Sequence, residues 1–131
     1  IGDSVSRILS KVNYDVKVLN YVDDSGLQVA DIIVGFKYGG FSESPPDEEK
    51  FANYCGDTVY VSTTSKYESD KDLESKRHEI LKELEDPTSD TAKFGKILTR
   101  KILSDQLDTV WNIGASYDCL NFESEIPVYT P

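Results

Sequence analysis

The chain has 131 residues, 38% hydrophobic and 29% charged, which is the composition of an ordinary soluble globular protein of single-domain size. Its 14 Lys and Arg against 24 Asp and Glu give a formal charge of −10, which argues against generic nucleic-acid binding, because such binding rests on neutralising phosphates with basic side chains. No apolar run approaches the roughly 20 residues of a membrane-spanning helix, and no basic-then-apolar signal layout begins the chain, so we expect no membrane partner.

The first segment has the spacing of an amphipathic helix. Apolar residues recur there at three- and four-residue intervals and form one stripe. Either Asp3 or Ser4 can cap the start of this helix, and we expect it to end near Asn13. The stripe consists of Val5, Ile8, Leu9 and Val12.

The β-branched run Val16–Val22 predicts a largely buried strand, and the residues after it predict a turn and a second helix. Asp24 or Ser25 can cap that helix, and Gly26 allows a close turn. A helix–strand–helix order is half of a parallel α/β unit, whose strand needs neighbours on its open edges. We therefore expect functional groups at the carboxyl end of the strand and further protein on the amino-terminal side. The helix face expected to pack back on the strand consists of Leu27, Ala30, Ile33 and Val34.

A loop without periodicity follows from Lys37 to Asp47, with paired glycines and a Ser-Glu-Ser-Pro-Pro run. We place a boundary here, between a first part (1–40) and a second part (41–131). Pro46 fits the first turn of a following helix, whose positive end the acidic residues after it would favour. Those residues are Asp47, Glu48 and Glu49.

The stretch from Phe51 to Tyr67 is ambiguous. Thr58–Thr63 has the β-branched and aromatic content of a strand. Apolar and aromatic residues in the same stretch also recur at the spacing of a helix face, so periodicity leaves both structures open. That face consists of Phe51, Tyr54, Cys55 and Val59.

Two further helices and an extended tail complete the chain. A helix from about Asp70 to Glu85 should end at the Asp-Pro pair that follows. The longest helix should begin at Thr88, Ser89 or Asp90 and end near Gly114. The tail from Tyr117 to Tyr129 is expected to be extended, since Pro127 and Pro131 exclude regular helix. The apolar face of the first helix comprises Leu73, Ile80, Leu81 and Leu84. The two apolar rows of the second comprise Phe94, Leu98 and Ile102, and Leu103, Leu107, Val110 and Gly114.

Two stretches, about a hundred residues apart, resemble the arginyl-tRNA synthetases. The first contains Ile1-Gly2-Asp3-Ser4, Ile8-Leu9 and Tyr21-Val22-Asp23-Asp24-Ser25-Gly26-Leu27-Gln28; the second contains Gln106-Leu107, Trp111, Gly114, Tyr117-Asp118 and Asn121-Phe122-Glu123-Ser124-Glu125. The resemblance implies an α/β fold: a helix-rich fragment of a class I Rossmann-type catalytic domain over residues 1–40, followed by a mainly α-helical connective insertion and return segment over residues 41–131. It also favours helix for the ambiguous stretch.

The family's two ATP-handling signatures are missing. His78 is the only histidine, so no His-x-Gly-His sequence exists, and Lys-Met-Ser-Lys is impossible without methionine. We therefore expect an internal fragment that is inactive alone and binds no cofactor. The resemblance implies that the full-length cytoplasmic enzyme joins arginine to its tRNA with ATP and Mg²⁺. The alternative is a stand-alone acidic helical interaction module.

Two groups of residues are the candidate sites. By resemblance, Asp24, Gly26 and Gln28 lie near the substrate cleft. Lys93, Lys96 and Arg100 would fall within about a 60° arc of one helix. They form a basic stripe that either contacts tRNA phosphates or is an ordinary solvated surface. We assign no catalytic residue and no metal ligand.

Other chemically suggestive residues have simpler explanations. Asp23 and Asp24 match a metal-binding pair and the Tyr-Val-Asp-Asp sequence of reverse-transcriptase palms, but that site needs a second strand where helical spacing follows. His78 is expected on the surface rather than as a catalytic base, and Trp111 in the core rather than stacked on a nucleotide. Glu123 and Glu125 are expected to be structural rather than an acid/base pair. Cys55 and Cys119 should be free thiols, buried or partly buried, in a reducing compartment.

Overall fold

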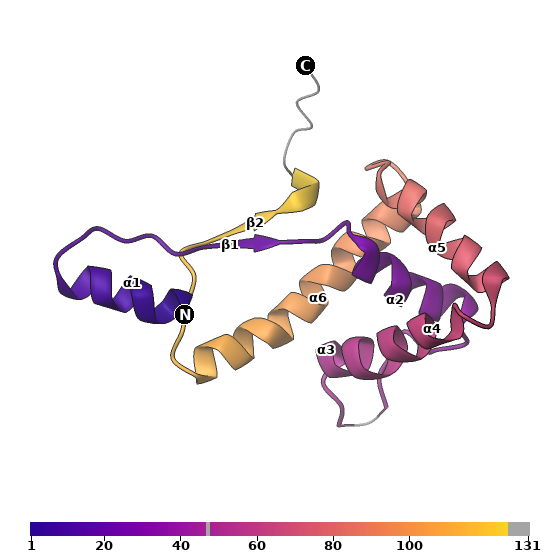
Figure 1. Cartoon of the computed structure of the whole chain (residues 1–131), viewed down its shortest axis with the longest axis horizontal. Coiled ribbons are helices and arrows are strands. Elements are labelled where there is room, and N and C mark those ends of the chain that lie inside the picture. The colour runs from indigo at the N-terminus through magenta and orange to yellow at the C-terminus, as the bar shows by residue number, and fades with distance from the viewer. Residues whose placement is uncertain (47, 126–131) are drawn as a thin grey trace, which may run out of the picture.

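The computed structural model describes residues 1–46 and 48–125. It is a helix-rich α/β structure with one small parallel sheet. In Figure 1, α1 lies at one end, the strands in the middle and α2 to α5 at the other end, while the long α6 runs from there back toward α1. In chain order the elements are α1 (Gly2–Lys11), β1 (Leu19–Val22), α2 (Leu27–Tyr38), α3 (Phe51–Asn53), the π-helix η1 (Tyr54–Tyr60), α4 (Val61–Lys66), α5 (Lys71–Leu84), α6 (Asp90–Asn112), β2 (Cys119–Phe122) and the 3-10 helix η2 (Glu123–Glu125).

Helix α2 is the centre of the core. Every residue from Val29 to Gly35 is buried, and a helix that is buried on all sides must be surrounded by other elements. Its main packing partners are α4, α5, α6 and η1 rather than the predicted strand. Leu27, assigned to the buried face by its spacing, is 51% exposed because it lies at the start of the helix, outside the bundle.

The ambiguous stretch is helical, so that prediction is confirmed. Helices α3, η1 and α4 follow one another from Phe51 to Lys66, and all four residues of the predicted helix face are buried. The β-branched Val59 and Thr63 are fully buried and face Gly35 of α2. Their tertiary burial outweighs the strand preference of the local sequence.

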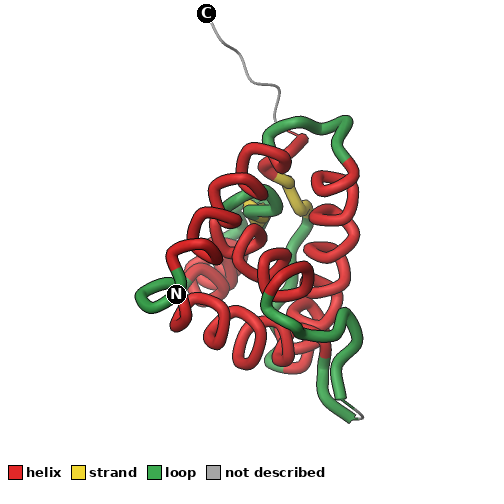
Figure 2. Tube along the Cα trace, turned by 90° about the vertical axis from the view of Figure 1, so that its right-hand side faces the viewer, coloured by secondary structure: helices red, strands yellow, loops and turns green. Residues whose placement is uncertain are grey.

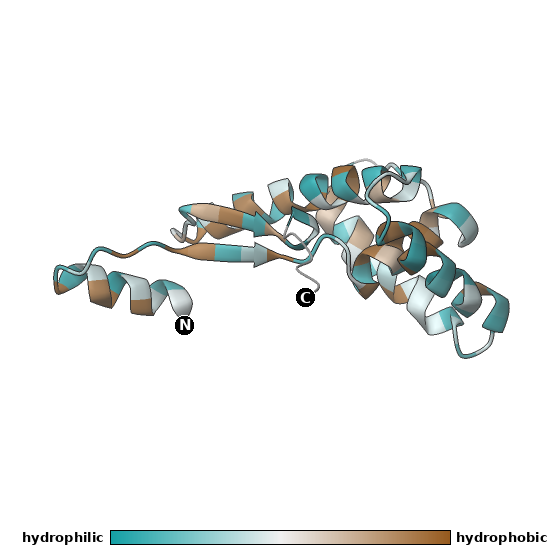
Figure 3. Cartoon of the chain, turned by 90° about the horizontal axis from the view of Figure 1, so that it is seen from above, coloured by the Kyte–Doolittle hydropathy of each residue, from teal (hydrophilic) through white to brown (hydrophobic). Residues whose placement is uncertain are grey.

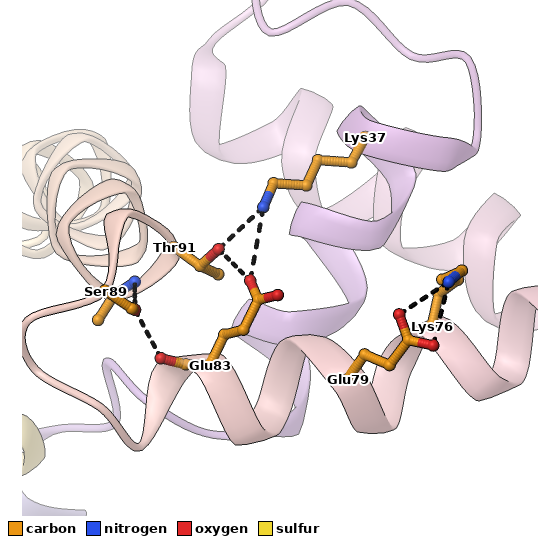
Figure 4. A network of polar contacts seen from close by, with 7 residues as sticks. Lys37, Lys76, Glu79, Glu83, Ser89 and Thr91 are labelled. Carbon is orange, nitrogen blue, oxygen red and sulfur yellow. Dashed lines mark hydrogen bonds and ion pairs between the residues drawn. The ribbon is translucent and has the colours of Figure 1, made fainter.

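Helices α5 and α6 are confirmed, with caps close to those expected. Asp70 accepts a hydrogen bond from Leu73 N (2.9 Å), and Ser89 accepts one from Ala92 N (2.9 Å). Figure 4 shows how the two helices join α2: Lys37 Nζ donates to Thr91 Oγ1 (2.9 Å) and lies 3.8 Å from Glu83 Oε2, to which Thr91 also donates. These contacts hold the start of α6 against α2 and α5.

The sheet differs from the prediction in two ways: its first strand is shorter than expected, and its second strand was not expected. Strand β1 covers only the last four residues of the predicted run, and its neighbour β2 comes from the tail. The two strands are parallel, with Leu19 opposite Cys119 and Val22 opposite Phe122. Figure 2, which looks nearly along the strands, shows them surrounded by helices in projection. Within the described residues, therefore, one neighbour of β1 comes from the chain itself.

Helix α1 lies apart from the bundle, and its predicted cap is wrong. The helix begins at Gly2 with Ile1 at the N-cap and no side-chain cap bond, and Asp3 instead accepts a hydrogen bond from Arg7 Nε (2.8 Å). Arg7 also donates to the Gly114 carbonyl, which ties α1 to the end of α6. The apolar stripe remains exposed, with Ile8 at 65%, and Figure 3 shows apolar residues interspersed along α1.

Three other predictions differ from the structure. Helix α2 has Gly26 at its N-cap without a side-chain bond, so neither Asp24 nor Ser25 caps it. The helix after the loop begins at Phe51 rather than near Pro46. Trp111 is 57% exposed rather than in the core, because the last turns of α6 extend beyond the bundle. Asp47, Pro127 and Pro131 lie outside the described residues.

No helix among the described residues is both long and apolar enough to span a lipid bilayer.

Candidate functional site

The turn after β1 is built by Asp23. Its Oδ1 accepts hydrogen bonds from Gly26 N (2.7 Å) and Ser25 N (3.3 Å), which folds the chain back over the aspartate side chain. A Cβ at position 26 would lie 2.3 Å from Asp23 Oδ2. Glycine at this position therefore allows the carboxylate to approach the backbone closely.

Asp24 has a different environment from its neighbour. It is only 5% exposed, and both of its carboxylate oxygens accept hydrogen bonds from Ser124. The backbone N–H of Ser124 donates to Oδ1 (2.8 Å), and its hydroxyl donates to Oδ2 (2.6 Å). The Asp-Asp pair therefore divides into an exposed residue that forms the turn and a buried one that contacts β2–η2 (residues 119–125), which we call the return segment.

Two hollows flank the turn. One, of about 750 Å³, lies between the turn, the end of α5, the start of α6 and η2, and it brings Asp24, Gly26 and Lys96 together. The other, of about 380 Å³, lies between β1, α2, η1 and α6, and Gln28 lines it. The predicted substrate-binding residues thus lie on the turn and the first residues of α2, and they line two different hollows.

Strand β1 and the return segment also contribute polar groups here. Ser25 Oγ donates to Glu123 Oε2 (3.3 Å). Partial loss of water and then the nearby Glu123 carboxylate raise the pKa of the Tyr21 phenol above its ordinary value. Glu125 lies 3.4 Å from Arg100. Glu123 and Glu125 both make contacts within the chain, as the predicted structural role requires.

The three cations of the predicted basic stripe lie along α6 in different environments. Lys93 pairs with Asp90 (3.0 Å). Arg100 lies near Glu125 and places its guanidinium 5.5 Å from the centre of the Phe122 ring. Lys96 lines the larger hollow, and within the described residues it has no hydrogen-bond or ion-pair partner. Of the three, Lys96 is the cation with the least internal compensation.

The remaining candidates lack the geometry for catalysis. Within residues 1–46 and 48–125, no group of three or more His, Cys, Asp or Glu side chains is placed to hold a metal ion. A polymerase palm is excluded because α2, and not a second strand, follows Asp24. His78 is exposed, as predicted.

The two cysteines are free, as predicted. Cys55 is buried in η1, and this burial raises the pKa of its thiol to about 12, so it stays protonated. The prediction of burial is wrong for Cys119, which is exposed because it lies on the edge strand β2.

Sequence reasoning missed Ser124 and Asp118, which bond to residues about a hundred positions away. Only the pairing of β1 with β2 reveals their partners. The one available signal was that both lie in the second stretch that carries the family resemblance.

Comparisons with known proteins agree with that resemblance. The family described as tRNA synthetases class I (R), catalytic domain, matches residues 1–122. Among curated relatives, the chain is 28% identical to an arginine–tRNA ligase from Thermococcus kodakarensis, 32% to one from Deinococcus radiodurans and 30% to one from Thermus thermophilus. Each alignment covers 96% of this chain but only 19–21% of the relative.

The chain thus spans about a fifth of the length of the curated relatives it matches. Because the family match covers 122 of its 131 residues, including β1 and β2, the chain belongs to the family of class I tRNA synthetase (R) catalytic domains.

Proposed function

We propose that this chain is part of an arginine–tRNA ligase, which activates arginine with ATP and transfers it to the 3′ end of its tRNA. The observation that carries the proposal is the similarity to arginine–tRNA ligases over 96% of the chain. An enzyme of protein synthesis with this activity would act in the cytoplasm. The alternative of a stand-alone interaction module is not favoured, because a catalytic-domain family matches nearly the whole chain.

We further propose that residues 1–40 belong to a Rossmann-type nucleotide fold and that residues 41–131 form its helical insertion and return segment. Two features support this division. The first part holds the helix–strand–helix order of a parallel α/β unit. The second part consists mainly of helices and then forms β2, which pairs in parallel with β1 of the first part.

The turn after β1 supplies the proposed substrate contacts. Ligands of α/β folds bind outside the carboxyl ends of the parallel strands, and Gly26 and Gln28 lie there beside the two hollows. Asp24 was expected to join them in contacting substrate, although in this chain its carboxylate faces Ser124. The basic side chains of α6, with Lys96 the least compensated, are the proposed contacts to tRNA phosphates.

The described residues do not fit a role in holding Mg²⁺ or the ATP phosphates. They present no cluster of metal-ligating side chains, and the sequence lacks both ATP signatures of class I synthetases. The chain's proposed contribution is therefore to shape the cleft and to contact arginine or tRNA.

Arginine-dependent exchange of pyrophosphate into ATP tests the proposal. The complete protein should catalyse this exchange with arginine and not with lysine, whereas residues 1–131 alone should give only the buffer background. In the complete protein, replacing Gln28 with Ala should raise the KM for a substrate of the activation step by about tenfold, which is the loss of one hydrogen bond to a charged group. Gln106→Ala, at the glutamine that lines the same hollow from α6, then tests whether the effect belongs to Gln28 or to the hollow as a whole.

Two results would refute the proposal. Absence of arginine-dependent exchange by the complete protein would refute the ligase function. Exchange by residues 1–131 alone would refute the assignment of ATP binding to other parts of the enzyme.

A further inference from the structure

The parallel pairing of the two strands continues beyond their ends through two aspartates. Within the sheet, each residue of β1 faces the residue 100 positions later in β2. At the start of the strands, Val18 N donates to Asp118 Oδ2 (2.7 Å), and Asp118 N donates to the Val18 carbonyl (2.8 Å). Beyond their other end, Asp24 accepts a hydrogen bond from Ser124 N, at the same separation of 100 residues.

Each aspartate accepts a backbone N–H of the opposite segment, so the two bonds are reciprocal. A parallel pair of four-residue strands is marginal by itself, since isolated two-stranded sheets are barely stable in water. Carboxylates that bind backbone N–H groups form hydrogen bonds about twice as strong as neutral ones. The pairing of β1 with β2 therefore depends on these side chains as well as on its own ladder.

The Asp24 end differs from the Asp118 end in burial and geometry. Asp24 is 5% exposed, whereas Asp118 is exposed, so the bonds of Asp24 are little weakened by competing water. Both of its oxygens are occupied by a single partner, at 2.8 and 2.6 Å. Each oxygen keeps a second lone pair, but the two bonds hold the buried carboxylate in one orientation, toward Ser124.

The contact joins the two walls of the larger hollow. Ser25 and Gly26 follow Asp24 on one wall, and Glu123 precedes Ser124 on the other. The bond from Ser25 Oγ to Glu123 crosses between the same two segments. Loss of the Asp24 contact would let the turn move relative to the return segment.

We propose that Asp24 is a positioning residue: through Ser124 it fixes the return segment against the turn after β1, and it does not itself contact arginine, ATP or tRNA. The effect on catalysis rests on the proposed ligase function, whereas the effect on the return segment does not. Displacement of a substrate-binding group by about 1 Å can cost a hundredfold in rate. We therefore expect the Asp24 contact to affect kcat more than substrate affinity.

A double-mutant cycle on the complete protein separates positioning from direct contact. The variants are Asp24→Asn, Ser124→Ala and the double variant, with Ser124→Thr as the conservative variant that keeps the hydroxyl. Asp72→Asn is the matched control, because Asp72 is an exposed acid on α5 without a hydrogen bond among the described residues. Two measurements are made: hydrogen exchange of the backbone amides of residues 119–125, and the kinetics of arginine-dependent pyrophosphate exchange.

Both single variants should speed amide exchange of the return segment by about ten- to a hundredfold, which corresponds to the loss of hydrogen bonds to a charged group. Ser124→Ala removes only the hydroxyl donor and keeps the backbone N–H bond to Asp24 Oδ1, so its effect should be the smaller of the two. The double variant should be no worse than Asp24→Asn alone, because the hydroxyl bond is already lost there. Ser124→Thr and Asp72→Asn should match the wild type. The kcat of pyrophosphate exchange should fall in the same pattern, with the KM for arginine and for ATP within about twofold of the wild type.

Two results overturn the proposal. One is unchanged amide exchange in Asp24→Asn. The other is a raised substrate KM in Asp24→Asn with a normal Ser124→Ala, since direct contact with substrate does not depend on Ser124. If the amide pattern appears but the wild type shows no arginine-dependent exchange, the positioning contact is supported and the ligase function fails.

Discussion

Asp31 is a fully buried carboxylate at the centre of the core. Tyr67 Oη donates to one of its oxygens and Arg77 to the other, both at 2.7 Å. The guanidinium of Arg77 also lies 5.1 Å from the centre of the Tyr67 ring. A buried charge is tolerated only when it is paired and hydrogen-bonded, and here the pairing joins α2 to α5 and to the end of α4.

Replacement of Asp31 by Asn should therefore destabilise α5 more than the loss of one ordinary hydrogen bond. The amide keeps the shape, but it leaves Arg77, whose side chain is 24% exposed, without a counter-charge. Breaking such a pair costs about 3 kcal/mol, whereas Tyr67→Phe, which removes only the hydroxyl donor, should cost about 1 kcal/mol. The measurement is the free energy of local opening of α5, from hydrogen exchange in the complete protein. Equal losses in the two variants would mean that the ion pair contributes nothing beyond the hydrogen bond.

Loss of water on burial, and then the bond to Asp31, raise the pKa of the Tyr67 phenol. The folded state therefore holds this proton at a pH where the unfolded chain releases it. Its contribution to stability is complete below the ordinary pKa of tyrosine and declines as the pH rises above it.

Residue pairs of this kind could not be predicted from the sequence. An aspartate within an apolar helix signals that a buried partner exists, but Tyr67 and Arg77 are 36 and 46 residues away. The same limit explains Asp24. Its oxygens suit a helix cap, and only the pairing of β1 with β2 assigns them to Ser124, 100 residues later.

At the scale of elements, local periodicity predicted the long helices correctly. It did not predict elements whose structure depends on a packing partner far away in the sequence. Helices α5 and α6 have strong apolar rows and cap residues close to their starts. Strand β2 was predicted only as extended chain, because four residues without a known neighbour carry little signal. Helix α1 was predicted from its stripe, but the sequence does not reveal that the stripe lies apart from the bundle.

Two glycines should respond in opposite directions to the same substitution. At Gly35 of α2, a Cβ would lie 2.5 Å from Val59 Cγ1 and 2.7 Å from Thr63 Oγ1, whereas at Gly56 of η1 it would meet nothing within 4 Å. Gly35→Ala should therefore cost about 1–2 kcal/mol net, since overpacking exceeds the gain in helix propensity. Gly56→Ala should be neutral or stabilise by up to about 1 kcal/mol. Hydrogen exchange of the α2 and η1 amides measures both, and a stabilising Gly35→Ala would contradict the close packing of α2 on η1 and α4.

At the scale of the whole molecule, the two stretches that carry the family resemblance lie side by side. The first ends in the turn after β1, and the second contains β2 and η2. Between them the chain forms the helices that pack around α2. The two stretches that carry the resemblance therefore contain the residues that hold the start and the end of this helical segment together.

The predicted contact of α6 with tRNA is best tested at a single side chain, Lys96. Removing all three charges, at Lys93, Lys96 and Arg100, should raise the KM for tRNA in the complete protein. Arg100 also contacts Phe122 and Glu125, so the triple variant would disturb the return segment as well. Lys96→Gln avoids this problem, because the Lys96 amino group has no partner among the described residues.

If Lys96 contacts a tRNA phosphate, Lys96→Gln should raise the KM for tRNA and reduce the slope of its salt dependence by about one, with the KM for arginine and for ATP unchanged. Lys82→Gln is the matched control, because Lys82 is an exposed lysine on α5 that likewise has no partner among the described residues. A nonspecific effect of net charge would change both variants equally, because each removes one positive charge and makes the net charge of −10 more negative by one unit. A phosphate contact would change only the Lys96 variant. Equal tRNA kinetics for the two variants across a salt series would leave the stripe as ordinary surface.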